Sequence, residues 1–405
     1  MVTLEAGRSL NETPALRIAP PKFLADPALR AVLAALPGAR VVGGAVRDAL
    51  LGHSMADIDL ATCLPPEQVM RALTDAGIRA VPTGIAHGTV TAVVDGRGFE
   101  VTTLRRDVAT DGRHAEIAFT DNWRVDAARR DFTINAMSLA RDGAVFDYFT
   151  GIADLRAGRV RFVGDPATRI AEDFLRILRF FRFQARYGTG APDPAALAAI
   201  RASVGGLALL SVERVWSELQ RILAAPEPSG AVALMAELGV LAAVLTEGAA
   251  PDKLACLVAA GAPTDPLLRL AALLTGDPRA LADRLRLSGA TRERLVALRG
   301  LPVPDPDAED DSLRRLLADH DPDILIGRAW LAGLNAPAWD RLRARLAATP
   351  RPEFPLHGRD ALALGGAPGP DLGAALREIR CWWLAGGCRA DASACRAELA
   401  RRLGA

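Results

Sequence analysis

Apolar positions follow two different patterns along the chain. From about Phe23 to Asp154, short apolar runs rich in valine and threonine alternate with stretches of helical spacing. The strand-like runs are ARVV, DIDLAT, GTVTAVV and FEVTTLRR, and the helical ones are AVRDALLG and PEQVMRALTDAG. Strands interleaved with short helices predict an α/β domain built on one mixed sheet with helices.

The pattern changes twice beyond these runs. Between Arg105 and Arg130 the sequence is polar and rich in Asp and Arg, which predicts a long loop. After Asp165-Pro166, long stretches of Ala, Leu and Arg have helical spacing, and Asp165 suits an N-cap with Pro166 at the first helical position. Prolines predict breaks between these helices at residues 226–230, 263–266, 302–306 and 350–355.

We therefore expect a multidomain chain with an α/β head followed by an all-α neck, body and tail. A length of 405 residues with 50% hydrophobic positions is too great for one compact domain. The predicted segments are an N-terminal leader at 1–24, the head at 25–158, the neck at 159–225, the body at 226–300 and the tail at 301–405.

Charge is balanced over the whole chain but not locally. Lys+Arg 49 against Asp+Glu 48 gives a formal net charge of +1, which excludes a disordered chain and a histone-like polycation. Between Arg156 and Arg186, however, arginines far outnumber the three acids, Asp165, Glu172 and Asp173. A nucleic-acid partner is therefore compatible with the neutral total.

The residue inventory excludes several kinds of active site. The only two lysines, Lys22 and Lys253, do not occur in a Gly-Lys-Ser/Thr sequence, so a P-loop is excluded, and GxSxG, HExxH and CxxC are also absent. Carboxylates and arginines must then carry any catalysis. Because no apolar stretch approaches the roughly 20 residues of a membrane span or forms a secretory signal, we expect a cytoplasmic protein with free thiols.

Carboxylates mark the first candidate site. In a strand, Asp57 and Asp59 project to one face while Ile58 packs behind, and a divalent ion such as Mg²⁺ would relieve their repulsion. Glu100, in the strand-like GFEVTTL, could add a third carboxylate to a site for phosphoryl or nucleotidyl transfer. The alternative is a pair of acids on a solvent-facing strand edge.

A glycine turn and two arginine clusters are the other candidates. Gly43-Gly44 between a strand and a helix, with Arg47 one turn later, suits phosphate oxygens, although a tight turn is the simpler interpretation. A second cluster could bind a triphosphate and ribose and includes Arg130, Asp131 and Asn135. A third has helical spacing and comprises Asp173, Arg176, Arg179 and Arg182.

These motifs occur together in a known family. GGAVRDALLG, DIDLAT, FEVTTLR, RRDFTINAM and EDFLRILRFFRF, in that order over residues 38–190, closely resemble the class II tRNA nucleotidyltransferase / bacterial poly(A) polymerase family. Phe354–Leu362 and Gly366–Pro370 also resemble its C-terminal region. The resemblance implies a nucleotidyltransferase-fold head and a helical neck, body and tail.

The resemblance also implies roles for individual residues. Asp57 and Asp59 match the metal-binding pair, Glu100 the third carboxylate, and Gly44 and Arg47 the triphosphate contacts, with Gly43 beside them. The nucleotide-contacting Arg-Asp corresponds to Arg130 and Asp131. Base recognition is implied for Asp173 and Arg176, and Arg179 and Arg182 continue that nucleotide-binding row.

The implied activity is template-independent addition of CCA to the 3′ end of tRNA from CTP and ATP, with release of pyrophosphate and a two-metal Mg²⁺ mechanism. Its partners are tRNA (3′ end and elbow), CTP and ATP, with no membrane and no evident protein partner. The stretch Arg105–Arg130 is long enough to contain the family's flexible loop, which favours full CCA addition. The alternatives are a poly(A) polymerase and a catalytically dead tRNA-binding protein.

Three further features are interpreted as structural. Cys381, Cys388 and Cys395 recur every seven residues, which predicts a packing face on a helix rather than a zinc site. His320-Asp321 lacks nearby histidines, so it predicts a turn and not a phosphohydrolase site. Trp382-Trp383 predicts a buried helix anchor.

Overall fold

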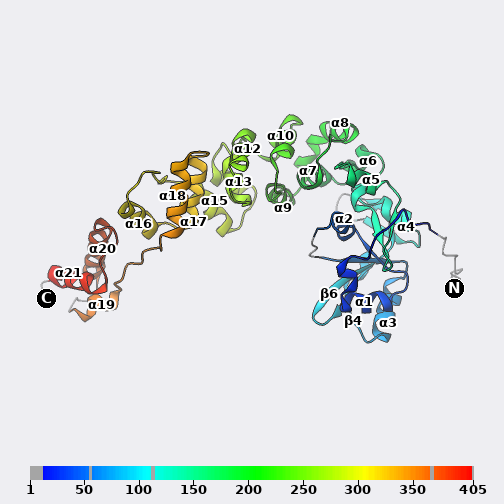
Figure 1. Cartoon of the computed structure of the whole chain (residues 1–405), viewed down its shortest axis with the longest axis horizontal. Coiled ribbons are helices and arrows are strands. Elements are labelled where there is room, and N and C mark those ends of the chain that lie inside the picture. Colours follow the sequence, from blue (N-terminus) through cyan, green and yellow to red (C-terminus); the bar gives the residue numbers. More distant parts are fainter. Residues whose placement is uncertain (1–11, 54–56, 111–114, 365–368, 404–405) are drawn as a thin grey trace. The chain divides into compact units, whose positions relative to one another are not determined.

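Figure 1 shows the computed structural model, which describes residues 12–53, 57–110, 115–364 and 369–403. The described residues form two compact units. The first runs from the N-terminal side to Leu219 and includes Leu234–Val244, and the second comprises Gln220–Ala233 and everything described from Leu245 onward. The predicted boundaries between neck, body and tail remain predictions.

An eight-stranded mixed sheet organises the first unit, in the order β1-β10-β9-β2-β3-β6-β5-β4. The strands are β1 (Leu16–Arg17), β2 (Arg40–Val42), β3 (Asp59–Thr62), β4 (Arg79–Gly84), β5 (Thr89–Val94), β6 (Arg97–Thr103), β9 (Met137–Leu139) and β10 (Ala144–Asp147). Strands β3 and β6 run parallel, while β2 pairs antiparallel with both β3 and β9. The prediction of an α/β head with a mixed sheet is confirmed, and within the predicted leader β1 pairs with β10.

Short helices join and cover these strands. They are α1 (Pro27–Ala35), α2 (Gly44–Leu50), α3 (Pro66–Asp75), α4 (Trp123–Ala128) and α5 (Gly151–Arg156), with 3₁₀ turns η1 (Lys22–Ala25), η2 (Ile85–His87) and η3 (Thr133–Asn135). Helix α1 begins at Pro27 because the Asp26 carboxylate accepts hydrogen bonds from the free amides of Ala28 and Leu29. Its apolar stripe, with Leu29 and Val32, is buried.

The expected loop at Arg105–Arg130 is wrong. Strands β7 (Arg105–Thr110) and β8 (Ala115–Phe119) pair antiparallel there, and Asn122 then caps α4. Cross-strand pairing supplies the backbone hydrogen bonds of this segment, so the strands form despite charged residues that hide the usual apolar alternation.

Helices follow without a further described strand. Those that begin before Leu245 are α6 (Pro166–Glu172), α7 (Leu175–Tyr187), α8 (Pro194–Ser203), η4 (Val204–Leu209), α9 (Val212–Leu223), α10 (Ser229–Glu237) and α11 (Val240–Val244). Aromatic packing fixes α7 on the head, because the Phe162 ring lies 4.8 Å from that of Phe132 and 6.0 Å from that of Phe180. All three rings are buried.

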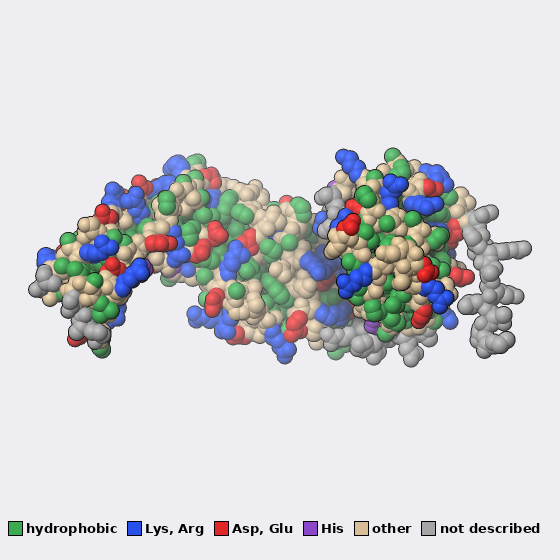
Figure 2. Space-filling model, turned by 90° about the horizontal axis from the view of Figure 1, so that it is seen from below, with side chains coloured by type: hydrophobic (Ala, Val, Ile, Leu, Met, Phe, Trp, Pro, Cys, Tyr) green, Lys and Arg blue, Asp and Glu red, His purple; other side chains and the backbone are tan. Residues whose placement is uncertain are grey.

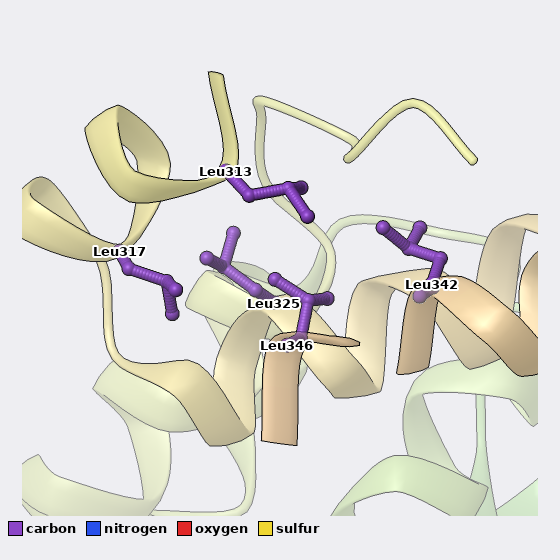
Figure 3. Packing of buried hydrophobic residues seen from close by; sticks show 6 residues of the cluster. Leu313, Leu317, Leu325, Leu342 and Leu346 are labelled. Carbon is purple, nitrogen blue, oxygen red and sulfur yellow. The ribbon is translucent and has the colours of Figure 1, made fainter. Parts of the chain in front are cut away.

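The second unit has helices and no named strand among its described residues. Its later helices are α12 (Pro251–Ala259), α13 (Pro266–Leu273), α14 (Pro278–Arg284), α15 (Gly289–Leu298), α16 (Asp310–Asp319), α17 (Pro322–Ala332), α18 (Pro337–Ala348), α19 (Gly358–Ala363), α20 (Pro370–Ala385) and α21 (Ala392–Leu403). Leucines from α16, α17 and α18 converge in one buried cluster (Figure 3), which includes Leu313, Leu325 and Leu346. The predicted change to an all-α architecture is confirmed. Among the described residues, no helix is both long and apolar enough to cross a membrane.

The three cysteines of the seven-residue repeat do not share a helix. Cys381 lies on α20, Cys395 on α21, and Cys388 between them in a turn with φ +57°. Cys395 is buried in an apolar cluster with Trp383, whose indole N–H donates to the Ala390 carbonyl at 3.1 Å. Trp383 is thus a buried anchor as predicted.

The His320-Asp321 pair also has a structural position. His320 follows α16, and the Asp321 carboxylate accepts the Asp323 amide at the start of α17. The predicted turn is confirmed.

Candidate active site

The three predicted carboxylates line one cavity beside the neighbouring inner strands β3 and β6 of the head sheet. Because β3 and β6 are parallel neighbours, Asp59 and Glu100 are directly paired in register, and Asp57 lies two residues before Asp59. All three side chains are exposed and line a cavity of about 620 Å³, together with Arg97. The fold therefore brings together acids that lie more than forty positions apart in the sequence.

The Asp59 carboxyl has a raised pKa, although its side chain is exposed. Partial burial raises the pKa of the Asp59 carboxyl, Arg130 opposes that effect, and the neighbouring Asp57 carboxylate raises the pKa further. A group whose charge is disfavoured in this way gains from an added cation.

Within the described residues, no three His, Cys, Asp or Glu side chains converge as a ready metal cage. The donor set nevertheless fits Mg²⁺, which binds proteins through one or two carboxylates and takes its other oxygens from water and phosphates. Asp57 and Asp59 are the pair that could hold it.

The glycine turn lies directly beside these acids. Val42, the last residue of β2, pairs with Asp59, and Gly43 then turns the chain into α2 with a φ of +70° that favours glycine. A Cβ on Gly43 would lie 3.4 Å from the Arg130 guanidinium, and one on Gly44 would lie 3.3 Å from that of Arg47. The turn thus lets two arginines approach the backbone closely.

Arg47 is buried and fully engaged with neighbouring side chains. Its Nε and Nη2 both donate to the Asp48 carboxylate at 3.0 Å, and its Nη1 donates to Asn135 Oδ1 at 2.6 Å. The Tyr187 hydroxyl donates to Asp48 at 3.0 Å, and the Tyr187 ring lies 4.2 Å from the Arg47 guanidinium. Arg47 here connects α2 to η3 and α7, and its predicted contact with a triphosphate stays a prediction.

The next cluster is built around Asp131. Its carboxylate accepts Asn135 Nδ2 at 3.1 Å and Arg179 Nε at 2.8 Å, and Arg179 Nη2 also donates to it. Burial alone would raise the pKa of Asp131, but Arg179 and these hydrogen bonds outweigh burial and lower it. The predicted residues Asn135, Asp131 and Arg179 therefore form one connected network with Arg47.

Arg130 stands apart from that network, on the side of the carboxylates. Its Nη2 lies 3.5 Å from Asp126, which also accepts Arg129 Nε at 2.8 Å. Burial lowers the pKa of the Arg130 guanidinium. Arg130 is thus a positive group close to the glycine turn and to Asp59.

The third cluster differs from the expected single helical stripe. Asp173 is not on the helix of Arg176: it lies in the break between α6 and α7 with φ −159°, where its carboxylate accepts the amide of Leu175, the first residue of α7, at 3.0 Å. Its other oxygen accepts Arg214 Nη2 at 2.7 Å. Asp173 and the α7 arginines therefore come from two separate backbone segments.

Each α7 arginine faces a different acceptor. Arg176 pairs with Glu172 and donates to the Arg169 carbonyl at 2.7 Å. Arg182 donates to Glu218 on α9 at 3.0 Å. The sequence analysis does not identify Arg214 and Glu218 as site residues. Their i,i+4 spacing, which puts both side chains on one face of a helix, is the signal that could have found them.

Comparisons with known proteins show which families and relatives the chain is similar to. Family models match residues 39–161, as the poly A polymerase head domain, and residues 191–250, as a probable RNA- and SrmB-binding site of polymerase A. The mitochondrial CCA tRNA nucleotidyltransferase 1 of Danio rerio is 38% identical over 359 residues, which cover 85% of this chain and 83% of that relative. A CCA-adding enzyme of Streptococcus gordonii is 33% identical over 87% of this chain and 90% of its own.

Solved structures are also similar. The Bacillus stearothermophilus CCA-adding enzyme in complex with CTP superposes with a TM-score of 0.72 at 27% identity, covering 93% of this chain and 98% of that one. The Thermotoga maritima CCA-adding enzyme complexed with tRNA has a TM-score of 0.64 at 20% identity, over 94% of this chain and 98% of that one, which is a likeness of fold.

Proposed function

Since this chain belongs to the family of class II CCA-adding tRNA nucleotidyltransferases, we propose that it adds C, C and A to the 3′ end of tRNA from CTP and ATP. The observation that carries the proposal is the register of Asp59 with Glu100 beside the Gly43 turn and Arg130. Three carboxylates on one cavity with a nearby guanidinium support the proposal, because metal-dependent nucleotidyl transfer uses clustered carboxylates and positive charge.

The chain's own residues position the reactants. Asp57 and Asp59 would hold Mg²⁺, and Glu100 would orient the RNA 3′-hydroxyl beside them. Arg130 would stabilise the negative charge of the phosphates. When bound, Mg²⁺ lowers the pKa of that hydroxyl and neutralises phosphate charge. The hydroxyl attacks the α-phosphorus in line and pyrophosphate leaves, so positioning and charge stabilisation account for most of the catalysis.

Base selection would come from side chains instead of a nucleic-acid template. Asp173 is an acceptor held by Arg214, and Arg176 is a guanidinium donor held by Glu172. An acceptor and a donor fork of this kind can read the polar edge of cytosine or adenine. Each polar group keeps a partner when no nucleotide is bound, which preserves its orientation.

A single-nucleotide extension assay with Mg²⁺ tests the proposal. A tRNA transcript ending at the discriminator base receives CTP, ATP or both, and an unstructured oligo(A) primer is the control substrate. We expect two additions with CTP alone, and one further A and then a stop with both nucleotides, on tRNA only. A long ladder with ATP would instead establish a poly(A) polymerase, and tRNA retention without extension would establish a binding protein.

A further inference from the structure

A second cavity lies within the second unit, among residues of α12, α13, α15 and α17. Its volume is about 460 Å³, and its wall includes Leu257, Leu298 and Trp330. Cavities of this size with an apolar wall and a few polar groups are typical of ligand sites in proteins. The predicted catalytic and nucleotide-binding residues all lie elsewhere, so the cavity has no part in the site described above.

Trp330 provides a rigid aromatic wall. The guanidinium of Arg343 lies 3.7 Å from the centre of its ring. Arg343 is itself buried and fixed, since it donates to the Gly333 carbonyl at 2.9 Å and to Asp340 at 2.6 Å. An indole held in this way loses little conformational freedom when a second planar group stacks on it.

The same cavity has an excess of positive charge. Three cations line it, Lys253, Arg299 and Arg328, against one acid, Asp252. Arg328 is only 5% exposed and donates to two carbonyls, at 2.7 and 3.0 Å, with no carboxylate partner in the described chain. Carbonyl oxygens carry only partial charge, so they leave part of this positive charge uncompensated.

Lys253 is the free group at this cavity. It is exposed on α12, and its ammonium group forms no hydrogen bond or ion pair with any described residue. A single unpaired ammonium group can neutralise one backbone phosphate, and an aromatic wall can stack against one base. The cavity therefore suits one nucleotide of an RNA chain better than it suits a free triphosphate.

We propose that this cavity binds one unpaired nucleotide of tRNA, with its base against Trp330 and its phosphate at Lys253. The inference rests on the proposed function for the identity of the RNA. Bases that are not paired can leave the stack and enter such a cavity, whereas bases within a duplex cannot. The site would add affinity for the body of the tRNA, separate from the 3′ end where nucleotides are added.

Filling the cavity tests the proposal. Cys256 is exposed and lines the cavity, so Cys256→Trp should occupy it, with Cys256→Ser as the matched control. For the full chain and a tRNA transcript, we expect Cys256→Trp to raise Kd by at least about fivefold, because stacking of one base contributes on that scale. Cys256→Ser should bind as the wild type does. Wild-type affinity in a folded Cys256→Trp variant would overturn the proposal.

A charge variant and a labelling experiment are independent of that substitution. Lys253→Gln should lower the slope of log Kd against log salt by about one, whereas Arg279→Gln, an exposed control on α14, should leave it unchanged. In the wild type, tRNA should slow alkylation of Cys256 by N-ethylmaleimide. Protection by CTP or ATP alone to the same degree, or no protection by tRNA, would contradict a tRNA nucleotide as the occupant.

The extension assay on the wild type separates the two proposals. A wild type that does not extend tRNA refutes the proposed function, whatever occurs at the cavity. A wild type that completes CCA while Cys256→Trp and Lys253→Gln bind tRNA normally refutes the cavity site alone.

Discussion

Asp59 combines two properties that surface carboxylates seldom share. It is paired with Glu100 in the sheet, and its pKa is raised by partial burial and by Asp57. An acid in such surroundings destabilises the isolated protein slightly, and strain of this kind is typical of functional sites. The Asp57-Ile58-Asp59 sequence predicts both acids on one face of a strand. In the structure β3 begins at Asp59 and Asp57 precedes it, so the two acids share a cavity but not a strand.

Asp59→Asn should therefore abolish most nucleotide incorporation. As the proposed metal ligand, Asp59 would supply several kcal/mol of charge stabilisation, so we expect the rate to fall by roughly 10²–10³-fold. The measurement is single-turnover CTP incorporation, with Asp75→Asn, an exposed acid at the end of α3, as the control. Filter binding of tRNA should be nearly unchanged, and a parallel loss of binding would mean that the fold was damaged.

Asp131 makes a different contribution, to stability. Arg179, the Asn135 side-chain amide and the Phe132 backbone amide lower its pKa in the folded state and outweigh burial, so its charged form is favoured there. Asp131→Asn should reduce the free energy of unfolding by about 2–3 kcal/mol at neutral pH, the scale for a charged hydrogen-bonded partner. Urea denaturation followed by tryptophan fluorescence measures this difference.

The pH dependence of that difference follows from the sign of the shift. An acid with a lowered pKa stabilises the fold above its ordinary value of 3.8 and loses this effect as pH falls through the lower folded value. The gap between wild type and Asp131→Asn should be constant above about pH 5 and narrow below about pH 4. A gap that widens as the pH falls would contradict the assigned pKa direction.

At the level of elements, sequence patterns predicted strands and motifs more successfully than they predicted which side chains pair with one another. The sequence predicts strand character for both the run with Asp59 and the run with Glu100, and the structure pairs these two strands. The β7–β8 hairpin was missed since its charged residues mask alternation. Asp173 was placed on a helix because its local spacing fits one, whereas its long-range partner Arg214, 41 positions away, is invisible to a local pattern.

The position of Arg176 directly after the break between α6 and α7 leads to a prediction about nucleotide specificity. Arg176 is the first of the three predicted nucleotide-binding arginines on α7. It forms an ion pair with Glu172, which directly precedes Asp173 in the sequence. Arg176→Ala should reduce the preference between CTP and ATP at a given step by roughly 5–100-fold, the scale of one bidentate base contact. The ratio of kcat/KM for the two nucleotides is the measurement.

Triphosphate binding by Arg176→Ala should fall much less than discrimination does. Arg201→Ala, which removes an exposed arginine paired with an exposed glutamate, is the matched control. Unchanged discrimination in Arg176→Ala would refute the assignment of base reading to this position.

Helix α7 also depends on its aromatic packing. Phe180 is fully buried and stacks on Phe162 at 6.0 Å, which joins α7 to the head. Phe180→Ala should cost about 3–5 kcal/mol in unfolding free energy through the cavity that it leaves. Leu209→Ala, at a side chain that is 78% exposed, should change stability by less than about 0.5 kcal/mol. Thermal melting compares the two, and equal effects would contradict the packing argument.

For the whole molecule, the distribution of charge matters more than its sum. Figure 2 shows Lys and Arg side chains interspersed with Asp and Glu on the face in view. The arginine-rich stretch after Arg156 is less positive in effect than its composition indicates, because Arg161, Arg176 and Arg179 are paired with acids. Composition shows how many charges there are, but only the fold shows which of them are neutralised.

Three arginines of that stretch remain exposed without an acidic partner in the described chain: Arg156, Arg159 and Arg186. If tRNA is the substrate, these should supply phosphate contacts, and log Kd should depend linearly on log salt although the chain is nearly neutral. Arg159→Gln should lower the slope by about 0.7–0.9, because one fewer counterion is released on binding. Arg17→Gln, at an arginine already paired with Asp142, should leave the slope unchanged. Equal slopes for wild type and Arg159→Gln would show that the phosphate contacts come from the paired arginines, which would then have to exchange their carboxylates for RNA on binding.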